Sequence, residues 1–557
     1  MTQEAGAKQP DDPSDSPPRR AAATAAEPPP DHSTGRRTDS AATPATATTA
    51  AGTTGGTGRP PVPPLAPPVM IGGNPRRRYV ARDLTTGSIP KNLASLAWPQ
   101  VVEGLLNVFD QVWDLFLAGQ GFGFRAIAGI GSAQQVVQLM RTGRMGLDTA
   151  MRAMIARAVG AGDRELARHI AQQAFTVNIL LAIVVTGFGV IFTEVILRGL
   201  GISEAVIEQA AGYMRWQFAG TLALTARMAT GTALQAAGDA VTPMKATTAA
   251  RLVDIALAPI LMFGLLEAPA FGVAGVAVAN LIGQTLGAVI NVRNLANGRS
   301  GLHVTLRGYH FDPHLIGRLV RIGGPATINS IERSAAQVIL LALMAPFGDV
   351  ALAAYALTQR TQMVVNIGTQ GVGNASGIIA AQSLGAGQLT RARATVLWAL
   401  GYVAVAKLVI VGLLFVFPEF FLKIFNDDPE LLHVGRIWLR IMLIGYFAMG
   451  PVQVLTQSFQ TAGDTLMPMI TTLLAMWVIE VPLAIVLSGT AERSGVPLPS
   501  WGNLGHYGVA TAISVAAFFR LAMYLPYFVW GPWHKKRVLE GVRVEPVPEE
   551  PVAIPPV

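Results

Sequence analysis

Long apolar stretches recur along most of the chain, from about residue 90 to about residue 531. A helix needs about 20 mostly apolar residues to cross the hydrocarbon core of a bilayer, and these stretches reach that length. Most are interrupted by Gly, Pro, Asn or Gln, which is typical of helices that pack on one another or line a cavity. We predict twelve transmembrane helices, at residues 91–119, 124–158, 165–197, 203–236, 241–265, 272–296, 312–345, 349–383, 391–421, 429–461, 466–488 and 507–531.

One stretch, after the fourth helix of each half, occurs twice. Residues 234–244 (LQAAGDAVTPM) return as residues 459–469 (FQTAGDTLMPM), 225 positions further on. In each copy the glycine permits a tight turn, the aspartate (Asp239 or Asp464) can cap the next helix, and the proline fits the first turn of that helix. We interpret both copies as structural turns at the cytoplasmic ends of helices.

Two further segments repeat at the same offset. The Gly-Ala-Gly of residues 160–162 returns at 385–387, and the Phe-Gly of residues 122–123 returns at 347–348. One offset shared by separate segments indicates a tandem duplication. Because each repeat holds six predicted helices, an even number, the two halves should have the same orientation and be related by an axis along the membrane normal.

The composition supports a membrane protein. Of the 557 residues, 51% are hydrophobic and 14% are charged, and the mean hydropathy is +0.42. Soluble proteins carry about 25% charged residues, so the chain is too apolar for that class. The absence of cysteine excludes disulfides, zinc–thiolate sites and cysteine nucleophiles. The fold class is therefore an all-α polytopic membrane protein.

The charge pattern predicts the topology. Lys and Arg gather in the loops that follow even-numbered helices and beside the first helix, so both termini are predicted to be cytoplasmic, in the cell (plasma or inner) membrane. The N-terminal segment is rich in Ala, Thr, Pro and Gly, has no signal-peptide core, and is predicted to be disordered. The predicted domains are a cytoplasmic tail (1–88), a six-helix lobe (89–298), a cytoplasmic linker (299–311), a second six-helix lobe (312–533) and a cytoplasmic tail (534–557).

The sequence lacks the motifs of common enzyme classes. It contains no G-x-x-x-x-G-K-[ST], no H-E-x-x-H and no G-x-S-x-G, and its eight histidines show no metal-ligand spacing. An enzyme is therefore not expected, and no cofactor is expected. The basic pI of about 9.9 is explained by the cytoplasmic loops, so nucleic acid is not an expected partner.

The ordered motifs resemble those of the multidrug and toxic compound extrusion (MATE) transporters. Each half has a Gly-Ala-Gly turn after its second helix and an Ala-Gly-Asp-x-x-x-Pro-Met turn after its fourth. Pro99 followed by residues 114–119 (DLFLAG) resembles the family's first helix, and residues 271–279 (FGVAGVAVA) resemble its sixth. The resemblance, closest to the prokaryotic DinF-like branch, implies twelve helices in two lobes around a V-shaped central cleft. It also implies export of amphipathic compounds against inward H⁺ or Na⁺ flow.

Carboxylates inside the membrane are candidates for ion coupling, because a charge near the bilayer centre costs at least about 2.5 kcal/mol. Asp110 and Asp114 are four residues apart and share one face of the first helix. The resemblance places the family's coupling aspartate at Asp114. On the fifth helix the DinF-like pattern Asn-x-x-x-Asp is replaced by Asp254 and Ala258, so the carboxylate lies one turn earlier.

Further polar residues extend the candidate set. The resemblance adds Asn280 on the sixth helix to the coupling group, where Na⁺ at Asp114 and Asp254 is an alternative to H⁺. Glu332 on the seventh helix and Glu480 on the eleventh are candidates for a cation site in the second lobe; another branch of the family carries a glutamate near Glu332. Each also has a purely structural interpretation, as a side chain satisfied by neighbouring helices.

The second helix carries an unusual number of charges for a membrane span. Arg144 and Asp148 are spaced i, i+4 and could pair, and Arg141 needs a watery cavity or a buried partner. If these residues line the cleft, their positive charge disfavours cationic substrates and favours anionic or zwitterionic ones.

These observations predict a secondary-active multidrug exporter that works by alternating access. Its expected partners are the lipid bilayer and amphipathic small molecules, and it is expected to be monomeric. Two alternatives stay open: a flippase for a lipid-linked precursor of the same superfamily, and a membrane receptor or scaffold without transport activity. The receptor alternative predicts that removing residues 1–88 abolishes function, whereas a transporter should survive that deletion.

Overall fold

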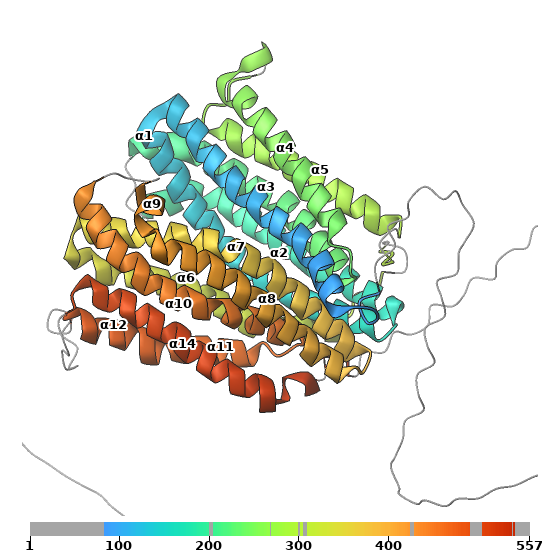
Figure 1. Ribbon diagram of the computed structural model, residues 1–557. Helices are drawn as coiled ribbons and strands as arrows, with labels where there is room; N and C mark the ends of the chain where they lie inside the picture. Colours follow the sequence, from blue (N-terminus) through green and yellow to red (C-terminus); the bar gives the residue numbers. More distant parts are fainter. Residues whose placement is uncertain are drawn as a thin grey trace, which may run out of the picture. The chain divides into compact units, whose positions relative to one another are not determined.

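The computed structural model describes residues 83–199, 204–267, 269–298, 301–304, 309–423, 428–490, 504–536 and 538–540. In this part of the chain every regular element is helical, which confirms the all-α membrane fold (Figure 1). The first half contains α1 (Ile89–Gly160), α2 (Arg164–Gly199), α3 (Glu204–Ala236), α4 (Val241–Phe263) and α5 (Ala274–Ala296). The second half contains α6 (Pro313–Met344), α7 (Asp349–Gly385), α8 (Leu389–Val416), α9 (Pro418–Lys423), α10 (Pro429–Thr461), α11 (Leu466–Leu474), α12 (Val481–Ser488) and α14 (His506–Trp530). Short helical turns complete it: η1 (Leu265–Glu267), η2 (Ala345–Phe347), η3 (Ala475–Glu480) and η4 (Pro532–Lys535).

α1 holds the first two expected spans in one continuous helical segment, which doubles back on itself. Val101 lies against Gly371, and the carbonyl of Arg157 lies against Gly385. An α-helix rises about 1.5 Å per residue, so Val101 and Arg157 would be about 84 Å apart if α1 were straight. The residues that they contact on α7, Gly371 and Gly385, are only about 21 Å apart along that helix. The chain therefore returns along α7, and Figure 1 shows the ribbon bending near the α1 label.

Two other expected spans are irregular. The ninth, residues 391–421, is divided into α8 and α9 just before Pro418, because proline cannot continue the preceding helix. The eleventh, residues 466–488, is divided by η3, which is a π-helical turn that ends at Glu480. Single π-helical turns are frequent at functional sites.

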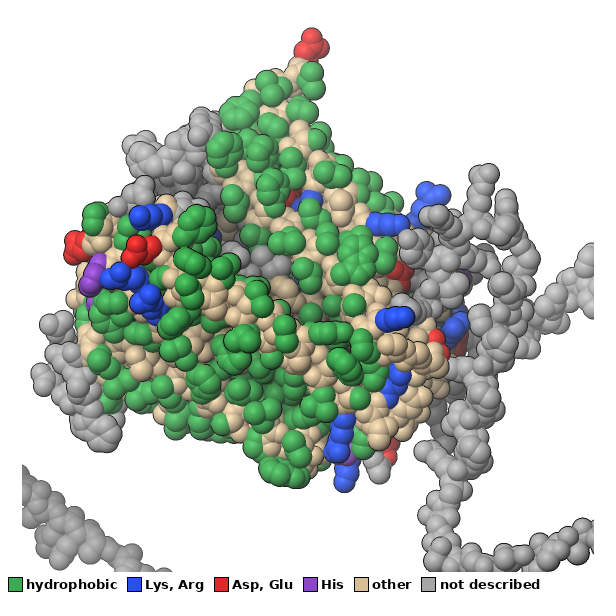
Figure 2. Space-filling model, viewed as in Figure 1, with side chains coloured by type: hydrophobic (Ala, Val, Ile, Leu, Met, Phe, Trp, Pro, Cys, Tyr) green, Lys and Arg blue, Asp and Glu red, His purple; other side chains and the backbone are tan. Residues whose placement is uncertain are grey.

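The outward faces of α2 and α8 are apolar. These are the third helices of the two halves, and fewer than a quarter of the residues in their most apolar windows are buried in the protein. Eight helices in the described residues are long and apolar enough to cross a membrane. Figure 2 shows hydrophobic side chains over much of the visible face, with charged side chains mostly toward its two ends. The most exposed large hydrophobic residues on these two helices are Val184, Ile191, Val195, Val405, Leu408, Val409 and Val416.

The repeated Gly-Asp turns are alike in backbone and unlike in side-chain bonds. Gly238 and Gly463 have φ angles of +98° and +94°, a conformation that favours glycine. Asp239 caps α4 as predicted, because its Oδ1 accepts hydrogen bonds from the backbone N–H groups of Val241 and Thr242. Asp464 makes no such cap in the described structure. It accepts a hydrogen bond from the hydroxyl of Tyr527 instead.

The repeated Gly-Ala-Gly turns bring the two halves into contact. An added Cβ at Gly160 would clash with the backbone of Gln382, and one at Gly385 would clash with the carbonyl of Arg157. Positions 157 and 382 are equivalent at the offset of 225, so the contact is reciprocal, as at a two-fold axis. Glycine at both positions permits this close approach of backbones.

Candidate functional site

Three charged side chains from two helices meet inside the first half. Nη1 of Arg251 on α4 is 2.5 Å from Oδ2 of Asp110 on α1. The same nitrogen is 3.2 Å from Oδ2 of Asp254, which lies one turn further along α4. All three residues are buried, with exposed fractions of 8%, 4% and 1% respectively. The structure thus joins two of the candidate aspartates through one arginine.

Two asparagines complete this group. Nδ2 of Asn280 on α5 donates to Oδ2 of Asp254 at 2.7 Å, and Nη2 of Arg251 donates to Oδ1 of Asn107 at 3.1 Å. The remaining carboxylate oxygens, Oδ1 of Asp110 and Oδ1 of Asp254, are buried and have no hydrogen-bond partner among the described residues. We call Asn107, Asp110, Arg251, Asp254 and Asn280 the carboxylate cluster.

Close helix packing places Asn280 in this cluster. Gly283 lies three residues after Asn280, on the same face of α5, and an added Cβ there would clash with the carbonyl oxygen of Ala250. The glycine therefore lets α5 approach α4 closely enough for the Asn280 amide to reach Asp254. On α4, Arg251 and Asp254 share one face because of their i, i+3 spacing.

The cluster has the composition of a proton-binding site. Two carboxylates and one guanidinium carry a net charge of −1, so a single proton makes the group neutral. An uncompensated buried charge is costly, which favours uptake of that proton. The two carboxylate oxygens without partners are the atoms where it would bind.

Two expected site residues cannot be placed in this geometry. The side chains of Asp114 and Arg141 lie outside the described part of the structure. The roles predicted for them therefore stay predictions. The described residues show that the carboxylate at position 110 makes the contact with α4, whereas the sequence resemblance places the coupling aspartate at position 114.

Two charges of the second span pair with each other inside the first half. Arg144 and Asp148 form the expected i, i+4 ion pair, with Nη1 2.6 Å from Oδ2. Their exposed fractions are 6% and 7%. One turn further along α1, Arg152 donates to Oδ1 of Asn374 on α7 at 3.0 Å. In this arrangement the Arg144–Asp148 pair is neutral and buried, so it offers no free positive charge to a substrate.

The candidate glutamates of the second half have different surroundings. Glu480 forms a buried ion pair with Arg520 on α14, with Nη2 2.9 Å from Oε2. Glu332 on α6 is also buried, at 6% exposed, but neither carboxylate oxygen has a hydrogen-bond partner among the described residues. Its neighbour Arg333 is exposed. The structure therefore supports a structural pair at Glu480 and leaves Glu332 as a buried, unpaired carboxylate.

Sequence reasoning missed three buried cations. Arg251 could have been found from its i, i+3 spacing to Asp254, which is the spacing of a helical ion pair. Arg227 on α3 donates to Oε1 of Gln284 and to Oγ1 of Thr247, both at 2.6 Å, and no local pattern marks it. Lys407 is the one charged residue in a long apolar stretch of α8, which is itself a signal of function or unusual packing.

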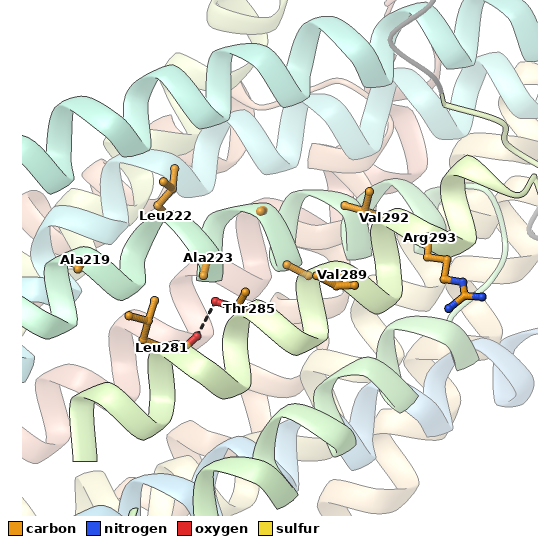
Figure 3. A pocket seen from close by; sticks show the side chains of 10 residues that line it. Ala219, Leu222, Ala223, Leu281, Thr285, Val289, Val292 and Arg293 are labelled. Carbon is orange, nitrogen blue, oxygen red and sulfur yellow. Dashed lines mark hydrogen bonds between the residues drawn. The ribbon is translucent and has the colours of Figure 1, made fainter. Parts of the chain in front are cut away.

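One pocket of the described structure contains none of the predicted site residues. It is an open groove of about 520 Å³ between α3 and α5, lined by alanines and aliphatic side chains such as Leu222 and Val289. Figure 3 shows Arg293 at one end of this groove. An open apolar groove on a membrane helix pair is expected to contact lipid, so we do not assign it to the ion site.

Comparisons with known proteins agree with this architecture. The MatE family model matches residues 99–260 and 325–486, one segment in each half. The chain is 27% identical over 457 residues to YoeA of Bacillus subtilis, a probable multidrug resistance protein, covering 81% of this chain and 96% of that protein. It is 24% identical over 465 residues to NorM of Thermotoga maritima, also a probable multidrug resistance protein, covering 82% and 96%.

A solved structure shows the same fold. It is an outward-facing multidrug resistance MATE family transporter of the MOP superfamily, with a TM-score of 0.72 and 20% sequence identity. The match covers 82% of this chain and 97% of that one. The two-lobe, twelve-helix architecture predicted from the sequence is therefore confirmed.

Proposed function

The chain belongs to the MatE family of multidrug efflux transporters, and from that premise we propose that it exports amphipathic compounds by coupling them to proton entry at the carboxylate cluster. The observation that carries the proposal is the sharing of Arg251 by Asp110 and Asp254. The assignment to the DinF-like branch still depends on the sequence resemblance alone.

A proton fits this cluster better than Na⁺. The Arg251 guanidinium lies between the two carboxylates and repels a metal cation at short range. A sodium site would also need several converging oxygen ligands. In this cluster the described contacts of both carboxylates come from N–H donors of Arg251 and Asn280 instead.

Coupling requires that the proton bind the two transport conformations differently. The cluster joins α1 to α4 and α5, so its charge affects how these three helices pack. In the unprotonated state the cluster holds one net negative charge, and a cationic or water-filled cleft stabilises that state. Protonation removes the charge and favours dry, close packing. This difference in free energy is the proposed link between proton entry and movement of the halves.

We further propose that the protein acts as a monomer in the cell membrane with both termini in the cytoplasm. One chain contains both lobes of the family fold, so a transport unit needs no second copy. The basic residues of the loops support the orientation.

Transport by purified protein in liposomes tests the coupling ion. Ethidium or norfloxacin export would be driven either by an imposed pH gradient or by an imposed Na⁺ gradient. We expect export with the pH gradient alone, and we expect Asp254→Asn and Asp110→Asn to reduce it to the level of empty liposomes. Glu194→Gln is the matched control, because Glu194 is a half-exposed carboxylate paired with Arg215 on α3, away from the carboxylate cluster.

Two outcomes would contradict the proposal. Export driven only by the Na⁺ gradient would replace the proton with sodium. Export that persists in both Asp variants would remove the cluster from the coupling mechanism. Absence of export for every dye in the wild type would direct the test to a lipid-linked substrate instead.

A further inference from the structure

A lysine is buried in the core of the second half. Lys407 lies on α8 and is 1% exposed. Its Nζ donates to the carbonyl oxygen of Val365 at 3.1 Å and to Oδ1 of Asn366 at 2.7 Å, both on α7. It forms no ion pair among the described residues. The side chain thus connects α8 to α7 through two neutral acceptors.

The surroundings are shaped to hold this side chain. Gly450 on α10 lies beside the lysine stem, and an added Cβ there would be 3.0 Å from Cγ and 3.2 Å from Cε of Lys407. Those distances are too short for an ordinary contact, so glycine provides the room that the stem occupies. The lysine is therefore enclosed by α7, α8 and α10.

The first half has no lysine at this place. With the offset of 225, Lys407 corresponds to Ala182, Val365 to Met140, and Gly450 to Thr225. Met140, Ala182 and Thr225 all line a small cavity in the first half, beside Arg144. The position occupied by the Lys407 amine in the second half is thus partly empty at the equivalent place in the first half. The buried amine is therefore specific to the second half and is not part of the structure that the two repeats share.

The acceptors match a neutral amine. An ammonium group has three N–H donors and cannot accept, whereas a neutral amine has two donors and one lone pair. The described surroundings provide two acceptors. A neutral amine would therefore have both of its donors bonded, and an ammonium group would keep one donor unpaired and one charge uncompensated in a dry core. Burying such a charge is costly.

We propose that Lys407 is a second proton-binding site of the transporter, neutral when α7 packs against α8 and protonated when α7 moves and water reaches Nζ. The lone pair of Nζ accepts a proton from water in the open arrangement and returns it to water when the helices close again. Protonation forms a third N–H bond on Nζ and deprotonation breaks it, and no other covalent bond of the chain changes. The role of this site in transport depends on the proton coupling proposed above, but its proton-dependent opening can be measured without transport.

The other ionisable groups around this position do not compensate the amine. On α10, Tyr446 lies one turn before Gly450 and donates its hydroxyl hydrogen bond to the carbonyl of Thr358. On α7, Tyr355 accepts a hydrogen bond from Gln359, and Arg360 is exposed. No carboxylate from α7, α8 or α10 contacts Lys407 in the part of the chain that the structure describes. The charge of the lysine is therefore governed by water access.

A single-cysteine reporter tests the proposal, because the natural chain contains no cysteine. Gln370 is exposed and lies one turn after Asn366 on the same face of α7. Gln370→Cys would be made in the full chain with Lys407 unchanged, with Lys407→Met and with Lys407→Arg. The rate of modification by a charged methanethiosulfonate reagent would be measured from about pH 5 to about pH 9, the range in which buried lysines titrate.

Dividing each rate by that of the Lys407→Met background removes the pH dependence of the thiol itself. With Lys407 unchanged, we expect this ratio to rise several-fold as the pH falls, because protonation favours the open arrangement. With Lys407→Arg we expect a high ratio at every pH, because arginine stays charged. Lys407→Gln provides a second neutral background if the methionine variant does not fold.

A ratio near one at every pH would overturn the proposal, and so would an arginine variant that behaves like the methionine variant. The same samples distinguish this result from a failure of the proposed function. If Asp254→Asn abolishes the response of Gln370→Cys to pH while Lys407→Met does not, the carboxylate cluster alone controls opening. If the Lys407 response persists in a protein that exports no dye, the lysine site stands and the substrate assignment fails.

Discussion

In the first half two buried carboxylates share Arg251, whereas in the second half, at a different place in the repeat, the buried amine of Lys407 is held by neutral oxygens. Where the two halves meet, they are nearly the same. Gly160 and Gly385 pack reciprocally at that contact. The duplication has kept residues that shape the backbone and changed residues that carry charge.

The side chains at the junction extend this symmetry. Nη2 of Arg157 donates to the carbonyl of Ala462 at 2.9 Å, and Nε2 of Gln382 donates to the carbonyl of Ala236 at 2.8 Å. Each therefore crosses to the end of the fourth helix of the other half. A polar side chain is needed at both positions, but a charge is present at only one of them. Geometry is conserved between the halves more closely than electrostatics.

Filling the junction should have a large effect on both export and stability. Gly160→Ala and Gly385→Ala each place a methyl group against backbone, which cannot move as a flexible side chain can. We expect both to reduce export to background and to lower the thermal unfolding temperature, by similar amounts because the contact is reciprocal. Overpacking of this kind costs about 1–3 kcal/mol or more. Tryptophan fluorescence during heating measures the stability.

Another pair of equivalent glycines is the matched control. Gly143 and Gly368 are also 225 positions apart, and an added Cβ at either would meet no atom within 4 Å. Alanine there should be neutral or slightly stabilising, because alanine favours helix over glycine by about 0.5–1 kcal/mol. If only one of the two junction variants is damaging, the reciprocal contact is not symmetric in energy.

Removing the arginine of a buried ion pair should destabilise the protein by different amounts in the two halves. Arg520→Met leaves Glu480 without its cation, close to the unpaired Glu332, whereas Arg144→Met leaves only Asp148. Removing one partner of a buried pair costs about 3–5 kcal/mol. We expect both arginine variants to be destabilised, and the second-half variant more strongly.

Double variants isolate the pair energy. Adding Glu480→Gln to Arg520→Met, or Asp148→Asn to Arg144→Met, should restore part of the lost stability, because no buried charge is then left alone. Unfolding temperatures of the purified proteins measure each cycle. Equal losses for the two arginines, with no recovery in the doubles, would show that the charges are not what distinguishes the halves.

The smallest effect is expected at the starts of the two halves. Asp312 caps α6 by accepting the backbone N–H of Leu315 at 3.0 Å, whereas Ser88, before α1, makes no side-chain cap bond. Burial raises the pKa of Asp312, but the N–H of Leu315 and the side chain of His169 outweigh it, so the pKa is lowered overall. A lowered pKa means that the carboxylate stabilises the fold above its unfolded pKa of about 3.9, and that this is lost as the pH falls further.

We expect Asp312→Ala to cost about 1 kcal/mol near neutral pH, as for other N-cap replacements, and the difference from the wild type to shrink as the pH falls below the unfolded pKa of about 3.9. Asp312→Asn separates the cap from the charge, because asparagine caps about as well as aspartate. Unfolding temperatures over this pH range provide the measurement. An undiminished difference at low pH would show that the charge of Asp312 contributes nothing. Ser88→Ala is the control and should change nothing.

Local patterns were sufficient to find part of the site. Asp110 and Asp254 were predicted because carboxylates stand out in apolar helices, and Arg144 and Asp148 because their spacing predicts a pair. Asn280 was predicted from the family resemblance. Their actual neighbours could not be predicted. The atoms that join Asp110 to Arg251 are 141 positions apart in the chain, and no periodicity reports such a contact.

The sequence by itself determined the class of protein, the duplication and nearly all helix boundaries, because apolar length, glycine turns and proline act locally along the chain. Only the tertiary structure decided which charges meet, since that depends on how helices from distant segments pack. The return of α1 along α7, the sharing of Arg251 and the enclosure of Lys407 by three helices are all consequences of that packing. The sequence shows which residues are charged, but only the packed helices determine which groups neutralise or bond them.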